Sequence, residues 1–244
     1  MTDAAHLFIS DLHLDAAAPA AVEQFLRFLA TEAAQAQSLY ILGDLFEVWV
    51  GDDDEEPARQ RVCEALLRLT RGGVPCFVVR GNRDFLFGAG FEARTGCRLL
   101  PDPLLATFGA QRVFVSHGDV LCTDDHSYQE LRSVVRDPEW QDHFLALPLA
   151  TRRVVADAAR AGSKAHTQAV QRAIMDVNPA AVITAFRVSG TRLMIHGHTH
   201  RPGIFQHEVD GEPAIRIVLG DWYDQGSVLV FRDDGRYELR NLAR

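Results

Sequence analysis

The sequence predicts an α/β fold in which a parallel β-sheet is combined with a helical insertion. Short apolar segments alternate with amphipathic helical patterns over about the first 100 residues, as in consecutive βαβ units. Residues 127–187 are then almost entirely helical in pattern. Strand-like segments return after this stretch, separated by Asp-Gly turns. With 244 residues, 47% of them hydrophobic, the chain can bury one sizeable core.

In the first half, buried strands are expected at residues 7–10, 40–43 and 76–81, where apolar residues form short continuous runs. Helices are expected around residues 20–34 and 59–70, where apolar residues recur three or four positions apart. Because helical crossovers connect parallel strands, we expect these strands to pair in parallel, with helices covering the sheet.

In the second half, a β-hairpin is expected at residues 104–108 and 112–116. The strands that follow the helical stretch are expected at residues 192–195, 203–209, 214–219, 227–231 and 237–241. We therefore assign residues 1–125 and 191–244 to the core and residues 126–190 to a helical cap. The cap has eight basic and six acidic residues, so it is relatively basic on an acidic body.

The composition excludes several classes of protein. A net charge of -8 and a pI near 5.7 argue against nucleic acid as a partner, since such proteins carry a basic face. No secretion signal is evident, and no segment approaches the roughly 20 apolar residues of a membrane-spanning helix. The four cysteines form no C-x-x-C pair and are expected to be free thiols in a reducing cytosol. We therefore expect a cytoplasmic monomer.

Five of the strand-like segments run into residues that can bind metal ions. These residues are Asp11-Leu12-His13, Asp44, Asn82-Arg83-Asp84, His117-Gly118-Asp119 and His198-Thr199-His200. A lone histidine of this kind is more often a hydrogen-bonded core residue, and a lone aspartate is more often a helix cap. Five blocks that each follow an apolar strand instead predict one site beyond the carboxyl ends of the strands.

The candidate ligands are too many for a single metal ion. They are Asp11, His13, Asp44, Asn82, His117, His198 and His200. Mixed His, Asp and Asn ligation suits manganese, iron or zinc, whereas magnesium prefers oxygen ligands alone. Two ions that share a carboxylate would lie about 3.5–4 Å apart, a spacing suited to in-line displacement at phosphorus.

The blocks D-L-H, G-D, G-N-R-D, H-G-D and G-H-T-H resemble those of the calcineurin-like dinuclear metallophosphoesterases over nearly the whole chain. This resemblance implies a four-layer αββα sandwich, here with a helical cap insertion. It implies that one metal ion is bound by Asp11, His13, Asp44 and His200. It implies that the other is bound by Asp44, Asn82, His117 and His198, so that Asp44 bridges the two.

A closer resemblance is to the pyrophosphatases of lipid A biosynthesis that hydrolyse UDP-2,3-diacylglucosamine. The segments that carry it are YILGDLFEVWVGDDD, HGDVLCTDD, AIMDVN and IHGHTHRP. It implies that water activated by two metal ions attacks the α-phosphorus, giving UMP and 2,3-diacylglucosamine 1-phosphate (lipid X). It also implies two Mn²⁺ ions per chain, a glycolipid nucleotide substrate and peripheral contact with the anionic inner membrane.

Arg83 supports this narrower interpretation. Many metallophosphoesterases have G-N-H-D, whose histidine can protonate a leaving alkoxide. Arginine cannot act as an acid at pH 7, but a phosphate leaving group needs no proton, and a guanidinium can bind it in a bidentate contact. Arg83 therefore favours pyrophosphate cleavage over hydrolysis of simple phosphomonoesters. The alternative is a structural salt bridge to Asp84 or another acid.

The insertion carries apolar residues that are expected to shelter acyl chains, or else to pack the cap onto the core. They are Trp140, Phe144, Leu145, Leu147, Leu149, Val154 and Val155. Basic residues nearby are expected either to contact anionic lipid or to form a plain solvated face. They are Arg152, Arg153, Arg160 and Lys164.

The resemblance also implies which residues contact the substrate, namely Asn82, Arg83, Asp125, Ser163, Thr167 and His198. Of the residues around the metals, it implies catalytic roles for Asp44, Asn82, Arg83, His117 and His198. One departure is Val170, which occupies a position where related enzymes have lysine, with Arg172 or Lys164 as alternative sources of charge.

Other features have structural interpretations. The acidic run Asp52–Glu56 is expected to be a solvated loop, or else Asp52 and Asp53 order the loop behind the metals. His196 lies next to the H-x-H pair, two residues before His198, and we interpret it as structural. Two rival functions are a metallophosphoesterase acting on soluble nucleotide-sugars or phosphodiesters, and a lipid-binding scaffold without activity. The complete ligand set argues against the scaffold.

Overall fold

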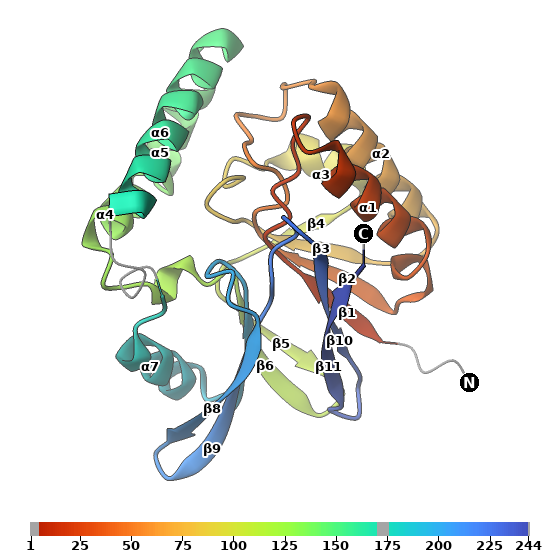
Figure 1. Cartoon of the computed structure of the whole chain (residues 1–244), viewed down its shortest axis with the longest axis vertical. Helices are drawn as coiled ribbons and strands as arrows, with labels where there is room; N and C mark the ends of the chain where they lie inside the picture. The colour runs from red at the N-terminus through yellow and green to blue at the C-terminus, as the bar shows by residue number, and fades with distance from the viewer. Residues whose placement is uncertain (1–4, 170–175, 244) are drawn as a thin grey trace.

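The computed structural model describes residues 5–169 and 176–243, with only the backbone of residues 163–169. The described strands form two sheets that face each other, and helices cover their outer faces (Figure 1). The first sheet has the order β11-β10-β1-β2-β3-β4, in which β1 to β4 are parallel. Its strands are β1 (His6–Ile9), β2 (Ser38–Leu42), β3 (Cys76–Val79), β4 (Arg98–Leu100), β10 (Gly226–Phe231) and β11 (Tyr237–Leu242).

The second sheet has the order β5-β6-β7-β9-β8, with a parallel centre and antiparallel edges. Its strands are β5 (Leu104–Phe108), β6 (Gln111–Ser116), β7 (Leu193–His196), β8 (Gly203–Val209) and β9 (Glu212–Val218). The hairpins β8–β9 and β10–β11 turn at Asp210-Gly211 and Asp234-Gly235, where both glycines have a positive φ. These hairpins confirm the prediction from the sequence.

The helices on the outside complete a four-layer sandwich. The first sheet is covered by α1 (Pro19–Ala30), α2 (Pro57–Arg71) and α3 (Ala89–Thr95), and the second by α7 (Pro179–Ser189). Side chains alternate along β1 accordingly: Leu7 and Ile9 pack under the helices, whereas Phe8 packs between the sheets. The predicted αββα architecture is therefore confirmed. The short elements α3 and β4 were not predicted from the sequence.

The predicted 126–190 insertion contains α4 (His126–Val135), α5 (Pro138–Leu145) and α6 (Leu149–Ala169) before α7. The side chains of Asp125 and Asp137 accept backbone N–H bonds at the starts of α4 and α5, which fixes where these helices begin. By contrast, α7 packs on the second sheet through its buried residues Val182 and Phe186. In the described chain, α4 to α6 thus lie apart from the sandwich layers (Figure 1).

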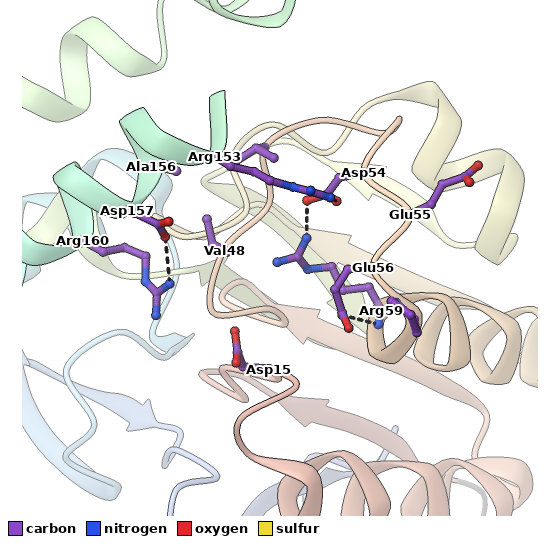
Figure 2. Close-up of a pocket in the computed structure, with 12 residues that line it drawn as sticks. Asp15, Val48, Asp54, Glu55, Glu56, Arg59, Arg153, Ala156, Asp157 and Arg160 are labelled. Atoms are coloured by element: carbon purple, nitrogen blue, oxygen red, sulfur yellow. Dashed lines mark hydrogen bonds and ion pairs between the residues drawn. The ribbon is translucent and has the colours of Figure 1, made fainter. Parts of the chain in front are cut away.

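The acidic run, residues 52–56, forms ion pairs between the core and α6. Asp53 pairs with Arg152, which also donates to the Val50 carbonyl, and Asp54 pairs with Arg153. Figure 2 shows Arg153 reaching from α6 to Asp54, which also binds Arg59. Because Asp54 is 1% exposed, the solvated-loop interpretation is wrong for this residue. Its burial follows from two arginines that compensate its charge.

The four cysteines are buried and form no disulfide, as predicted. Among the residues that the structure describes, no helix has both the length and the apolar composition to cross a membrane.

Candidate metal centre

The seven candidate ligands meet at one edge of the two sheets. Asp11 and His13 follow β1, Asp44 follows β2, and Asn82 follows β3. From the second sheet, His117 follows β6, and the pair His198 and His200 follows β7. Because parallel strands end at the same edge, residues that are far apart in the sequence come into contact there. His13 and His200, for example, are separated by 187 positions.

One group of ligand atoms forms around His13. Its Nε2 atom lies 3.3 Å from Nε2 of His200 and 3.7 Å from Oδ2 of Asp44. His200 Nε2 in turn lies 3.3 Å from Oδ1 of Asp11. One potential ligand atom each from Asp11, His13 and His200 falls within 4.8 Å of the others, which is close enough for a shared cation.

A second group forms around Asn82. Its Oδ1 atom lies 2.9 Å from His117 Nε2 and 3.0 Å from His198 Nδ1. His117 Nε2 is 3.8 Å from Oδ1 of Asp44. The two carboxylate oxygens of Asp44 therefore face the two groups separately, Oδ2 toward His13 and Oδ1 toward His117.

The donor set fits metal ions. Asp11 Oδ1 is buried and accepts no hydrogen bond from the described residues, although a buried carboxylate oxygen normally needs a donor or a cation. Burial lowers the pKa of His117, but the negative charges of Asp44, Asp119 and Asp11 outweigh burial and raise it to about 9. The carboxylates around His117 therefore favour positive charge at its position, and the centre offers the imidazole, carboxylate and amide atoms that borderline divalent ions prefer.

The backbone at this centre is strained. Among the described residues other than glycine, six have a positive φ, and five of these are candidate ligands: Asp11, His13, Asp44, His198 and His200. Each costs of order 1–3 kcal/mol and persists only where the surroundings impose it. Two backbone hydrogen bonds hold this conformation here. The Asp11 N–H donates to the Gly43 carbonyl at 3.1 Å, and the His13 N–H donates to the Asp44 carbonyl at 3.0 Å. The strained backbone directs these side chains into the candidate metal centre.

Three histidines are oriented by partners on their other ring nitrogen. His13 Nδ1 lies 2.9 Å from Oε2 of Glu47, His117 Nδ1 lies 2.8 Å from the Leu42 carbonyl, and His200 Nδ1 lies 3.5 Å from Oδ2 of Asp221. Such partners select the tautomer and aim the free nitrogen at the metal. Sequence reasoning did not find Glu47 and Asp221, because no regular spacing links them to the ligand blocks.

Asp84 supports the loops and does not pair with Arg83. Its carboxylate accepts the backbone N–H groups of Gly81 and Leu45, at 2.8 and 2.7 Å. Burial and the nearby charge of Asp44 raise the pKa of Asp84 to about 6. Arg83 Nε is buried without a hydrogen-bond partner among the described residues. The salt bridge from Arg83 to Asp84, one form of the structural alternative predicted from the sequence, is not formed.

A cavity of about 270 Å³ extends from Asn82 and Arg83 under the cap. Of the apolar cap residues singled out in the sequence, Trp140, Phe144 and Val155 line it. Leu149 packs on the core, and the remaining three, Leu145, Leu147 and Val154, are exposed. The cavity thus joins an apolar interior to cationic groups beside the metal centre.

The other predicted substrate contacts lie in the cap. Asp125 is buried and caps α4 through the Tyr128 N–H at 3.0 Å, and it does not line the cavity. Ser163 and Thr167 fall on α6, but their side chains lie outside the described residues, and Val170 lies outside them entirely. His196 is buried within the second sheet with Nε2 3.1 Å from Arg216, in keeping with a structural role.

Comparison with known families agrees with this geometry. A model of the calcineurin-like phosphoesterase family matches residues 6–202, a range that contains every candidate ligand. The chain belongs to the calcineurin-like phosphoesterase family. Curated relatives named UDP-2,3-diacylglucosamine hydrolase include that of Stenotrophomonas maltophilia (strain K279a), which is 48% identical over 98% of both chains. That of Salmonella typhi is 47% identical over 94% of this chain and 96% of its own. That of Aeromonas hydrophila subsp. hydrophila is 48% identical over 93% and 94%.

Proposed function

We propose that this protein hydrolyses the pyrophosphate bond of UDP-2,3-diacylglucosamine to UMP and lipid X in lipid A biosynthesis. The observation that carries the proposal is the apolar cavity that opens beside the phosphoesterase centre at Asn82 and Arg83. A soluble nucleotide-sugar has no acyl chain to fill such a cavity. The relatives named for this substrate match the chain over nearly its full length, which includes the cap.

We propose that the centre holds two Mn²⁺ ions. Asp11, His13, Asp44 and His200 would hold one, and Asp44, Asn82, His117 and His198 would hold the other. When bound, the ions supply acidification of the attacking water and neutralisation of charge on the phosphoryl oxygens. Asn82, Arg83 and His198 would bind the phosphates, while Asp125, Ser163 and Thr167 would contact the rest of the substrate.

Arg83 would bind the phosphate that departs with the sugar. Its side chain lines the cavity, and its backbone N–H donates to Asp44 Oδ1 at 2.8 Å, which ties it to the metal centre. Replacing Arg83 with methionine should lower kcat about 10²–10³-fold, the loss typical of removing one preorganised donor to developing charge. Arg83→Lys should recover part of this loss, because lysine keeps the charge but not the planar fork. Equal kcat values for Arg83→Met and the wild type would exclude this role.

The cavity would take an acyl chain, and a bulky side chain on α6 tests this. Ala159 and its neighbour Ala158 are both exposed, but only Ala159 lines the cavity. Ala159→Phe should raise KM for the diacylated substrate about tenfold, since displacing two methylenes costs roughly 1.6 kcal/mol. Ala158→Phe is the matched control and should leave KM unchanged. If the two variants have the same KM, the chain binds elsewhere.

We propose that the protein is a cytoplasmic monomer that rests on the anionic inner membrane and binds no nucleic acid. Arg152, Arg153 and Arg160 are paired with carboxylates of the core, so the contact would depend on exposed apolar side chains of the cap. These are Leu131, Val134, Leu145, Leu147, Val154, Val155 and Val188. Co-sedimentation with phosphatidylglycerol vesicles tests the contact, and a protein that stays in the supernatant would contradict it.

Hydrolysis of UDP-2,3-diacylglucosamine by the purified protein tests the function itself. With Mn²⁺ we expect UMP and lipid X in equal amounts, and with excess chelator we expect no product. An unacylated UDP-sugar, assayed in parallel, should be cleaved far more slowly. Faster cleavage of that UDP-sugar, or of a simple phosphodiester, would assign the protein to the alternative class of soluble-substrate phosphoesterases.

A further inference from the structure

Glu47 connects the metal centre with the cap through its two carboxylate oxygens. Oε2 lies 2.9 Å from Nδ1 of His13, and Oε1 lies 3.3 Å from the guanidinium of Arg160 on α6. The His13 side chain is 3% exposed and that of Glu47 is 21% exposed, so the contact to His13 is largely shielded from water.

The backbone fixes Glu47 beside His13. The N–H of Leu14 donates to the Leu45 carbonyl at 3.0 Å, and the N–H of Glu47 donates to the Leu14 carbonyl at 3.2 Å. Leu14 and Phe46 also form an isolated parallel β-bridge. With both backbones held in register, rotation of the Glu47 side chain is the main remaining freedom. Arg160 is the cap residue that limits this rotation.

Where α6 contacts the core, a cavity lies on each side of Arg160. A pocket of about 410 Å³ lies on one side, and the cavity that opens at Asn82 and Arg83 lies on the other. Both are lined by Val48, Val50, Ala156 and Arg160. Figure 2 shows Arg160 extending from α6 toward the core within the first of these spaces. Ion pairs link α6 to the core here, and the Arg160–Glu47 pair is the one that continues to a candidate metal ligand.

We propose that Glu47 is a positioning residue for His13 and that Arg160 sets the orientation of Glu47, so that the cap helix helps to shape the metal centre. The inference rests on the proposed two-metal site and adds to it a dependence on the cap. His200 provides an internal comparison, because its partner Asp221 also belongs to the core but makes no described contact with α6.

The test measures Mn²⁺ affinity directly, by electron paramagnetic resonance of the free ion, in the full-length protein. Glu47→Gln should raise the dissociation constant about 10-fold or more, as expected for the loss of a carboxylate that orients a ligand histidine. Arg160→Met should raise it by a smaller factor, and Arg160→Lys should bring it back toward the wild-type value. In the metal-free protein, ¹⁵N NMR should show His13 protonated at Nδ1, and Glu47→Gln should weaken that preference.

Arg153→Met is the matched control, since Arg153 is on the same helix and pairs with Asp54 instead of Glu47. It should leave Mn²⁺ affinity unchanged. Equal affinities for Arg160→Met and Arg153→Met would overturn the role of Arg160, and an unchanged affinity for Glu47→Gln would overturn the whole inference. A wild-type protein that binds no Mn²⁺ would instead contradict the proposed metal centre, so the two failures are distinguishable.

Discussion

Replacing Asp44 with asparagine is expected to lower kcat at least about 10³-fold, more than the 10–100-fold typical of residues that only orient a ligand. Asp44 is the residue whose two oxygens face both groups of ligands, Oδ2 toward His13 and Oδ1 toward His117. Asparagine keeps the oxygen that accepts the Arg83 N–H, so the loop geometry should survive. What is lost is the negative charge that two cations would share.

The measurement is steady-state hydrolysis over a range of Mn²⁺ concentrations, together with circular dichroism to confirm folding. Asp15→Asn is a suitable control, because Asp15 is two residues from His13 but belongs to neither group of ligands. It should change kcat less than about threefold, since a substitution that removes no metal or substrate contact leaves the transition state unaffected. More than a tenth of wild-type activity in Asp44→Asn, with the same Mn²⁺ dependence, would contradict a bridging role.

Replacing Asp119 with alanine is expected to lower the free energy of unfolding by about 3–5 kcal/mol, the usual cost of removing one partner of a buried ion pair. Asp119 is fully buried and anchors the first cap helix to the core. Its Oδ2 atom accepts hydrogen bonds from the Tyr128 hydroxyl at 2.6 Å and from Arg132 Nε at 2.8 Å. Without it, both partners lose their acceptor.

Urea unfolding at several pH values checks this prediction. Burial raises the pKa of Asp119, but the charges of His117, His198 and Arg132 outweigh burial and hold it well below its usual range. Its contribution is therefore present at neutral pH and is lost as the pH falls below about 4, the pKa in the unfolded chain. The difference between wild type and Asp119→Ala should shrink in acid.

The exposed pair Glu23–Arg61 supplies the control for stability. Both side chains are about half exposed, and Glu23→Ala should change the free energy of unfolding by less than about 1 kcal/mol. If Asp119→Ala is no more destabilising than Glu23→Ala, Asp119 does not anchor the cap.

Short apolar runs and the polar residues that follow them are enough to predict the candidate ligands and the strands longer than three residues. Parallel strands end at a common edge, so polar residues after β1, β2, β3, β6 and β7 converge whatever the details of the loops. The αββα layers were predicted from the resemblance of these blocks to a known family. The sequence does not predict the helix α3 or the three-residue strand β4, because each is too short to show a periodic pattern of apolar residues.

Features that depend on distant partners could not be predicted. The sequence predicts a solvated acidic run, whereas Asp54 within it pairs with Arg153, 99 residues away. Glu47 lies 34 residues from His13, and no spacing rule connects the two. The left-handed backbone at five of the ligands likewise depends on tertiary hydrogen bonds, such as those of Asp11 and His13, which no local sequence pattern reveals.

We propose that water attacks the α-phosphorus of UDP-2,3-diacylglucosamine at this metal centre. Hydrolysis in ¹⁸O-labelled water, followed by mass spectrometry of both products, tests it most directly. We predict one ¹⁸O atom in UMP and none in lipid X, with no turnover when Mn²⁺ is removed. Label in lipid X would mean that water attacks the other phosphorus, and would contradict the assignment of Arg83 to the leaving phosphate.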